Sequence, residues 1–221
     1  MNIKSYAEMI LRPRGKRRFV RNLKNEPKIL DVGCGNASVL GVKAMSPRCT
    51  YTGVDVADYA QTEFSKSLMD EYLVVDPQKF AETLEHLPRD FDAVLSSHNL
   101  EHCDEPDRVL GAMMSCLKPG GVIYLSFPCE QSIDFPSRHG TLNYYDDPTH
   151  TNQPPTVSQV LRALEGSGFE VTYCVNRYRP MPLFFLGLLF EPIARARKRI
   201  QLGTWELYGF ESIIHGRKLR S

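Results

Sequence analysis

The chain has 221 residues, 42% hydrophobic and 24% charged, a composition typical of a soluble globular domain that can bury a substantial core. Its net charge of +1 gives no general reason to expect nucleic acid as a partner. Six scattered cysteines without a Cys-x-x-Cys pair argue against a zinc site or a disulfide framework and favour free thiols in a reducing cytoplasm. No apolar core follows the N-terminal charges, so we expect no secretory signal.

The first part of the chain, residues 1–27, is expected to form a basic leader. Six arginines and lysines lie between Arg12 and Arg21, and Pro13 and Gly15 interrupt any long helix. A solvated segment or a short helix laid over the fold is the simpler interpretation. Contact with an anionic surface or a phosphate is the alternative. The remaining chain, residues 28–221, is expected to form a single domain.

An apolar run, residues 29–32, is predicted to form a buried strand that leads into a glycine loop. Gly33 and Gly35 permit a tight turn and let a ligand approach the bare backbone. Asn36 is expected to cap a helix that begins near Ala37. The free N–H groups of that helix would point at the ligand.

Two acidic residues flank this loop. Asp55 ends a second apolar run, twenty residues after Gly35, where a carboxylate can accept hydrogen bonds from both ribose hydroxyls of a nucleoside. Asp31 lies two residues before Gly33. Because a carboxylate there would repel a pyrophosphate and attract a free ammonium group, charge favours S-adenosylmethionine over NAD.

Strand and helix patterns alternate along most of the chain. Helices are expected over residues 39–45, 60–69, 80–86, 106–117 and 156–166, and further strands over residues 51–56, 72–75, 93–97, 122–127, 169–175 and 205–218. Such alternation predicts a parallel sheet covered by helices on both faces. Ligands of such sheets bind at the carboxyl ends of the strands.

Two stretches interrupt the alternation. Residues 128–155 hold five prolines among polar and aromatic side chains, so we expect a functional loop that folds over the ligand. Residues 180–203 contain the apolar block 183–190 followed by a basic run. The block is far below the roughly 20 residues that a membrane span needs. Packing against the domain or a second subunit is the simpler interpretation, and shallow insertion at the inner face of a membrane is the alternative.

Five ordered motifs resemble those of class I S-adenosylmethionine-dependent methyltransferases, in particular type 11-like members. They are Asp31-x-Gly33-x-Gly35, Gly53-Val54-Asp55, Phe91-Asp92-Ala93-Val94, Leu100-Glu101-His102 and Leu117-Lys118-Pro119-Gly120-Gly121. The resemblance covers residues 28–127 and continues more weakly to residue 175. It implies an α/β Rossmann-like fold with a seven-stranded sheet, mostly parallel with an antiparallel last strand, and S-adenosylmethionine as cofactor.

The same resemblance and the strand ends give an expected cofactor-binding set. It consists of Asp31 for the ammonium group, directly or through water, Gly33 and Gly35 for backbone access, Asp55 for the ribose, Asp76 near the adenine, and His98 and Asn99 beside the sulfonium. For Asp76, a helix cap before Pro77 is an equally good interpretation.

Methyl transfer to an alcohol is helped by a general base with a pKa near neutrality, which histidine supplies. His102, His139 and His150 are the candidates, although any single histidine is more often structural. His150 is favoured because residues 145–150 resemble a segment of methyltransferases of bacterial surface-polysaccharide and related sugar pathways. Asp147 could orient its imidazole.

The sequence therefore predicts an O-methyltransferase acting on a sugar or lipid-linked glycan intermediate. Methylation of a quinone-like or other lipophilic phenol is one alternative, and a nucleoside-binding module without turnover is another. Glu101 and His102 lie in a motif that some quinone-pathway relatives use for a divalent metal, but no second carboxylate partner is evident and no metal is expected. The oligomeric state stays open, as does contact of the basic ends with lipid.

Overall fold

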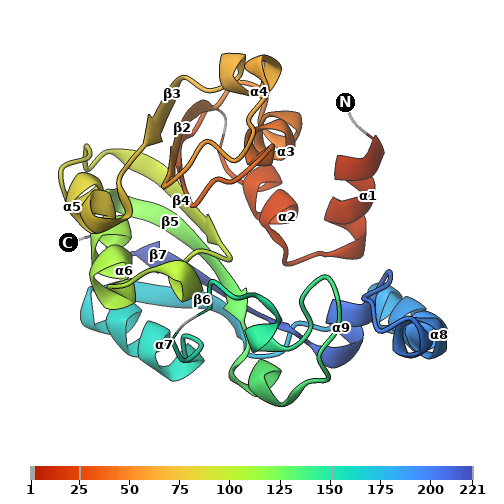
Figure 1. Ribbon diagram of the computed structural model, residues 1–221. Helices are drawn as coiled ribbons and strands as arrows, with labels where there is room; N and C mark the ends of the chain where they lie inside the picture. Colours follow the sequence, from red (N-terminus) through yellow and green to blue (C-terminus); the bar gives the residue numbers. More distant parts are fainter. Residues whose placement is uncertain (1–2, 25, 151, 221) are drawn as a thin grey trace.

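The computed structural model describes residues 3–24, 26–150 and 152–220, in which strands and helices alternate along the chain (Figure 1). The strands are β1 (Lys28–Val32), β2 (Thr50–Asp55), β3 (Glu71–Val74), β4 (Phe91–Ser97), β5 (Leu117–Pro128), β6 (Phe169–Val175) and β7 (Glu211–Lys218). They form one seven-stranded sheet in the order β3-β2-β1-β4-β5-β7-β6. Neighbouring strands run parallel except β7, which is antiparallel to both β5 and β6. The predicted fold class is confirmed.

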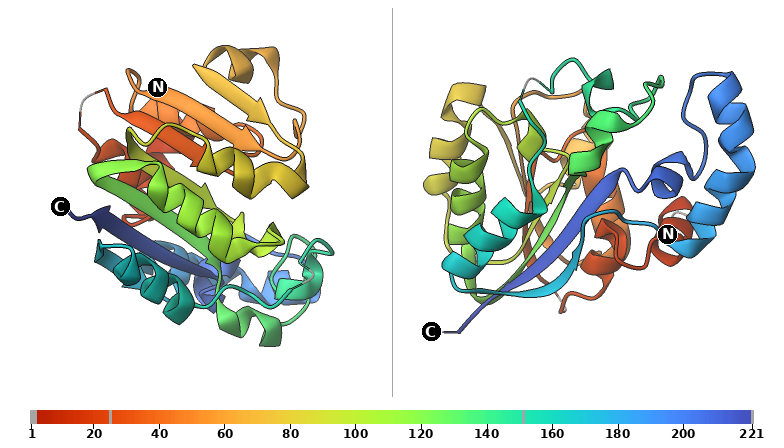
Figure 2. Two further views of the ribbon diagram at one scale, coloured as in Figure 1. Left: turned by 90° about the vertical axis from the view of Figure 1, so that its left-hand side faces the viewer. Right: turned by 90° about the horizontal axis from the view of Figure 1, so that it is seen from below.

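Helices cover both faces of this sheet (Figure 2). The α-helices are α1 (Ile3–Leu11), α2 (Lys16–Arg21), α3 (Ser38–Met45), α4 (Glu63–Ser67), α5 (Phe80–Glu85), α6 (Pro106–Ser115), α7 (Val157–Gly166), α8 (Met181–Ala196) and α9 (Thr204–Tyr208). Short 3-10 helices occur at η1 (Pro77–Lys79), η2 (Leu100–His102), η3 (Glu130–Asp134) and η4 (Tyr144–Asp146). Helices α5, α6 and α7 lie on one face, and α1, α2 and α3 lie on the other.

The apolar run of β1 is continuous because both faces of the sheet are covered. Successive side chains point to opposite faces of a strand. Leu30 and Val32 pack into the core beneath α5, α6 and α7, whereas Ile29 packs into the second core beneath α2 and α3. The N-terminal helices belong to this second core, since Val20 of α2 is 1% exposed there.

Two local predictions are wrong. Helix α3 begins at Ser38, and its N-cap is Ala37 in the left-handed conformation (φ 66°) without a side-chain cap, so Asn36 does not cap it. The glycine turn extends further along the chain than the sequence pattern indicated. Residues 204–208 form α9 rather than the start of the last strand. Gly203 and Gly209, both with positive φ, bound this short helix.

Candidate cofactor and active site

A cavity of about 740 Å³ opens at the carboxyl ends of the central strands. Gly33 and Gly35 follow β1, Asp55 ends β2, and His98 and Asn99 follow β4, and all five line this cavity. Open α/β sheets bind their ligands at this edge. The structure therefore brings together most of the predicted cofactor-binding set.

The two glycines of the loop have backbone conformations that side chains rarely adopt, and Gly33 also has no room for a side chain. Gly33 and Gly35 have φ values of 69° and 50°, which favour glycine. A Cβ atom at Gly33 would lie 2.5 Å from the Oδ1 atom of Asn99. The backbone here is consequently bare toward the cavity, as a closely approaching ligand requires.

Asp55 is held in place by this loop. Its Oδ2 atom accepts a hydrogen bond from the Gly35 N–H (2.6 Å), and its Oδ1 atom accepts one from the Val56 N–H (2.8 Å). Burial raises the pKa of Asp55, although the backbone donors oppose the shift. Asp55 also lines the cavity, where a carboxylate can accept hydrogen bonds from the ribose hydroxyls, as predicted.

Asp31 occupies a different environment from the expected one. Its carboxylate is fully buried and is not among the residues lining the cavity. It accepts hydrogen bonds from Lys16 Nζ (2.8 and 3.0 Å) and from the hydroxyls of Ser38 (2.6 Å) and Tyr51 (2.8 Å). Lys16 thus compensates the charge of this carboxylate, and a contact between Asp31 and the ligand ammonium stays a prediction. The carboxylate therefore favours an ammonium over a pyrophosphate less strongly than the sequence indicated, because Lys16 balances its charge.

Asp76 is exposed, and its carboxylate accepts a hydrogen bond from the Gln78 N–H (2.9 Å) at the start of η1. It serves as a helix cap, the alternative that the sequence left open, and does not line the cavity. Its neighbours Pro77 and Gln78 do line it, together with Phe80. Sequence reasoning missed these three residues, whose only signal was their position directly after β3.

His98 is a charged member of the site. Its Nδ1 atom lies 3.1 Å from Glu101 Oε1, and its Nε2 atom lies 3.3 Å from Glu211 Oε1. Burial alone would lower its pKa, but the two carboxylates raise the pKa of His98 to about 10. Arg12 also pairs with Glu211. His98 is thus an imidazolium at neutral pH and cannot act as a base there.

A second group of side chains meets beside the cavity. Glu101, His102 and His150 each offer one potential ligand atom, and the three atoms lie within 4.8 Å of one another. The Oε2 atom of Glu101 is buried without a hydrogen-bond partner. His102 lines the cavity. His150, from the long loop after β5, is buried beside it, with its ring centroid 4.6 Å from that of His102.

A hydrogen-bond relay orients His102. Its Nδ1 atom lies 2.9 Å from Thr149 Oγ1, and the Thr149 hydroxyl donates to Asp147 Oδ1 (2.6 Å). A carboxylate accepts only, so Thr149 in turn accepts from the Nδ1–H group of His102. The Nε2 atom of His102 is left with a free lone pair. Partial burial lowers the pKa of His102; Glu101 and Asp147 oppose this shift, and His150 adds to it.

His150 is buried, and its Nδ1 atom lies 2.6 Å from the Tyr144 carbonyl oxygen. Since a carbonyl only accepts, Nδ1 carries the proton and Nε2 is an acceptor. The expectation that Asp147 orients the His150 imidazole is wrong, because the Asp147 side chain acts on His102 through Thr149. His139 is exposed and outside the cavity lining.

These tautomers leave acceptors at Glu101, His102 and His150 without a donor between them. Two imidazoles and a carboxylate form a ligand set that suits a divalent cation. A proton bound by one imidazole would also satisfy the group. The expectation of no metal rested on the lack of a second carboxylate partner. The structure instead brings a third potential ligand of another kind, the His150 imidazole, from a distant part of the chain.

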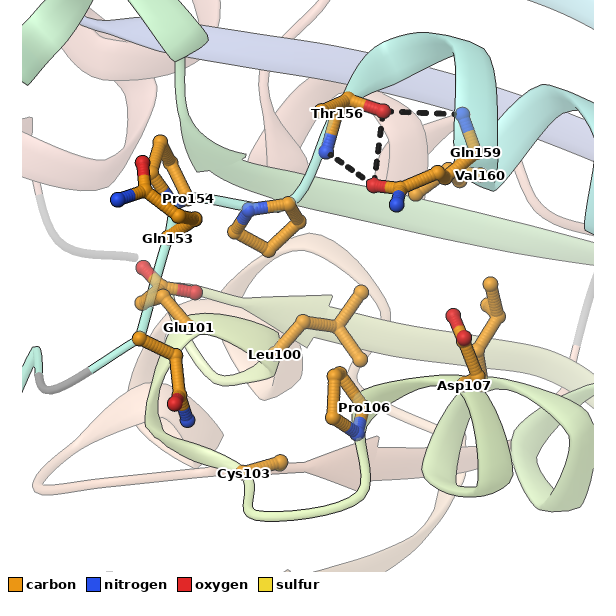
Figure 3. Close-up of a pocket in the computed structure, with 13 residues that line it drawn as sticks. Leu100, Glu101, Cys103, Pro106, Asp107, Gln153, Pro154, Thr156, Gln159 and Val160 are labelled. Atoms are coloured by element: carbon orange, nitrogen blue, oxygen red, sulfur yellow. Dashed lines mark hydrogen bonds between the residues drawn. The ribbon is translucent and has the colours of Figure 1, made fainter.

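A smaller cavity of about 290 Å³ has Glu101 of this cluster among its lining residues (Figure 3). Leu100, Glu101 and Pro106 form one side of it, and Pro154 and Val160 lie opposite. Glu101 lines this cavity and His102 lines the larger one, so the cluster lies between two open spaces.

The sheet order, the bare glycine turn and the acid at the end of β2 define a class I S-adenosylmethionine-dependent methyltransferase, and S-adenosylmethionine is its co-substrate. The chain belongs to the methyltransferase domain family, whose family model matches residues 5–173. Solved structures share the fold. A methyltransferase from Mesorhizobium loti aligns with a TM-score of 0.61 at 17% identity over 91% of this chain and 95% of its own. One from Archaeoglobus fulgidus aligns with a TM-score of 0.54 at 20% identity over 98% and 100%.

Curated relatives match a shorter segment. The ubiquinone biosynthesis O-methyltransferase of Dechloromonas aromatica is 34% identical over 102 residues, which is 45% of this chain and 43% of that protein. Its counterpart from Idiomarina loihiensis is 37% identical over 102 residues, 45% of this chain and 41% of that protein. The chain thus matches less than half the length of these relatives.

Proposed function

We propose that this methyltransferase methylates a hydroxyl group of a sugar or lipid-linked glycan intermediate, with His102 as general base. The observation that carries the proposal is the relay from His102 through Thr149 to Asp147. It fixes the tautomer in which Nε2 is free to accept a proton. The resemblance of residues 145–150 to sugar-pathway methyltransferases supports the choice of acceptor.

The cavity residues fit the co-substrate. The bare backbone at Gly33 and Gly35 admits close approach, and Asp55 keeps lone pairs for the ribose hydroxyls. The acceptor oxygen attacks the methyl carbon as the carbon–sulfur bond breaks, which gives a methyl ether and S-adenosylhomocysteine. The hydroxyl proton passes to His102 Nε2. Asp147 stabilises the resulting imidazolium through Thr149, and the main contribution of the remaining site is orientation of the two reactants.

A quinone-like or other lipophilic phenol is the second candidate acceptor. It is supported by the names of the curated relatives and by the Glu101, His102 and His150 set, which could hold a divalent cation. Such a cation would lower the pKa of a coordinated phenol and remove the need for a base. The two candidates therefore differ in their expected response to chelators.

Methyl transfer from labelled S-adenosylmethionine to sugar nucleotides, lipid-linked glycans and phenols tests both candidates. With the active acceptor, His102→Ala should lower turnover roughly 100-fold or more and leave S-adenosylhomocysteine affinity unchanged. His139→Ala is the matched control, since His139 is exposed and outside the cavity. Full turnover in His102→Ala would exclude the proposed base. Activity that a chelator abolishes and a divalent cation restores would instead assign the cluster as metal ligands.

His150 is tested in the same assay. His150→Ala should lower turnover less than His102→Ala, because the relay ends at His102. An equal loss, with cofactor affinity intact, would make His150 the base.

A further inference from the structure

Helix α8 stands at the edge of the molecule, with α9 between it and the body of the domain (Figures 1 and 2). Leu183, Gly187 and Ala194 form its buried side. A Cβ atom at Gly187 would lie 2.2 Å from the Gly203 carbonyl oxygen, so the two backbones are in close contact. The helix is therefore firmly packed along one side only.

The opposite side of α8 is apolar and exposed. Met181, Phe185, Leu188, Leu189 and Ile193 recur at the spacing of one helical face, and Phe185 and Leu189 are 58% and 68% exposed. No charged residue occurs between Met181 and Phe190. This is a contiguous stripe rather than the single exposed apolar side chains that are normal on a surface.

A basic cluster follows the stripe directly. Arg195, Arg197, Lys198 and Arg199 are all exposed. Within the described part of the chain, none of these four forms an ion pair. A surface that matches this patch would be apolar beside an array of negative charges. No described helix has the length and apolar character to cross a bilayer.

We propose that α8 lies in the plane of a membrane surface containing anionic lipids. The stripe would enter the boundary between headgroups and acyl chains, and the basic cluster would bind the headgroups. Four basic residues beside an uncharged helical face favour this occupant over a second copy of the chain. In a dimer these like charges would need acidic partners that the stripe does not carry.

The long loop after β5 is tied to this membrane helix. Arg138 forms two hydrogen bonds with Glu191 of α8 (2.8 and 2.5 Å), and Tyr208 donates to the same carboxylate (2.8 Å). The indole N–H of Trp205 donates to the Thr141 carbonyl (2.7 Å). The loop also carries His150, so the catalytic cluster would have a fixed position relative to the lipid surface. A helix bound at the membrane surface would thus place a lipid-linked acceptor near His102. This part of the inference rests on the proposed function.

Flotation of the full chain with lipid vesicles tests the surface. We expect binding to vesicles of phosphatidylcholine with about one-third phosphatidylglycerol, little binding to phosphatidylcholine alone, and weakening by salt. Replacement of Arg197, Lys198 and Arg199 by Gln should weaken binding roughly 100-fold. Phe185→Ser with Leu189→Ser should weaken it at least about tenfold. Phe64→Ser, a 66% exposed residue on α4, is the matched control and should bind normally.

Binding that ignores lipid charge, or that persists in both variants, would overturn the proposal. Sedimentation of the same proteins tests the alternative that the stripe binds a second copy of the chain. That alternative would be correct if the wild-type protein is a dimer that does not bind vesicles and the Phe185→Ser, Leu189→Ser variant is a monomer. S-adenosylhomocysteine affinity and turnover of a water-soluble acceptor should stay unchanged in every variant. These measurements thereby distinguish a failure of the membrane-binding proposal from a failure of the proposed methyl transfer.

Discussion

The replacement Asp31→Asn separates a structural role of Asp31 from a role in ligand binding. The substitution keeps the size of the side chain and removes its charge. Lys16 then loses its counter-charge next to a side chain with 0% exposure. Removal of one member of a buried ion pair costs roughly 3–5 kcal/mol. Since the Lys16 side chain is 20% exposed and can turn toward solvent, we expect a loss of about 2–3 kcal/mol in the free energy of unfolding.

A double-mutant cycle gives the pairwise contribution. Lys16→Met alone leaves the Asp31 carboxylate buried with only the hydroxyls of Ser38 and Tyr51, so it should also destabilise the protein. The double variant should be more stable than the sum of the single losses predicts, by about 1 kcal/mol or more. Urea unfolding followed by the fluorescence of the single tryptophan, Trp205, measures all four proteins.

Calorimetric titration with S-adenosylhomocysteine completes the experiment. If Asp31 acts through Lys16 and Ser38 on the loop, ligand affinity should fall less than about tenfold in Asp31→Asn. The reasoning is refuted if Asp31→Asn keeps wild-type stability, loses ligand affinity more than about 100-fold, and Lys16→Met binds the ligand more tightly. That combination would mean that Lys16 competes with the ligand ammonium for Asp31.

Three further predictions concern the cavity, the relay and the core. Asp55→Asn should weaken S-adenosylhomocysteine binding roughly 10- to 100-fold in calorimetry, because a charged acceptor for the ribose is lost; unchanged affinity would remove the ribose assignment. Thr149→Val should lower turnover about tenfold without changing ligand affinity, since His102 loses its connection to Asp147; an unaffected rate would exclude the relay. Burial lowers the pKa of His215 to about 4 from an ordinary 6.5, although the hydrogen bond to the Arg14 carbonyl opposes this shift. The unfolded chain alone therefore takes up this proton as pH falls from 6.5 toward 4, and stability should drop by about 2 kcal/mol between pH 6.5 and 5. Urea unfolding of His215→Gln should show a smaller drop, and an equal drop would assign the effect to other groups.

Much of the fold was determined by local pattern in the sequence. The apolar runs at 29–32 and 93–97 and the helical spacing after Pro106 each predicted an element that the structure contains. Such elements bury their apolar residues whatever their exact neighbours, so periodicity suffices to find them. Gly33, Gly35 and Asp55 could be predicted from the sequence because they lie at the ends of strands that the apolar runs had already located. The pattern failed at residues 204–208, where apolar residues of a short helix mimic strand alternation.

Only the tertiary structure decided which charges and imidazoles meet. Asp31 pairs with Lys16 on a separate helix, and His150 joins Glu101 and His102 from a loop nearly fifty residues away. Buried polar atoms must find partners wherever the chain places them. The interaction energies of these polar groups depend on burial and on distances of a few ångströms. The spacing of residues along the sequence does not specify either. The sequence alone therefore determined the methyltransferase sheet and most of its cofactor edge, and the folded chain decided the state of each ionisable group there.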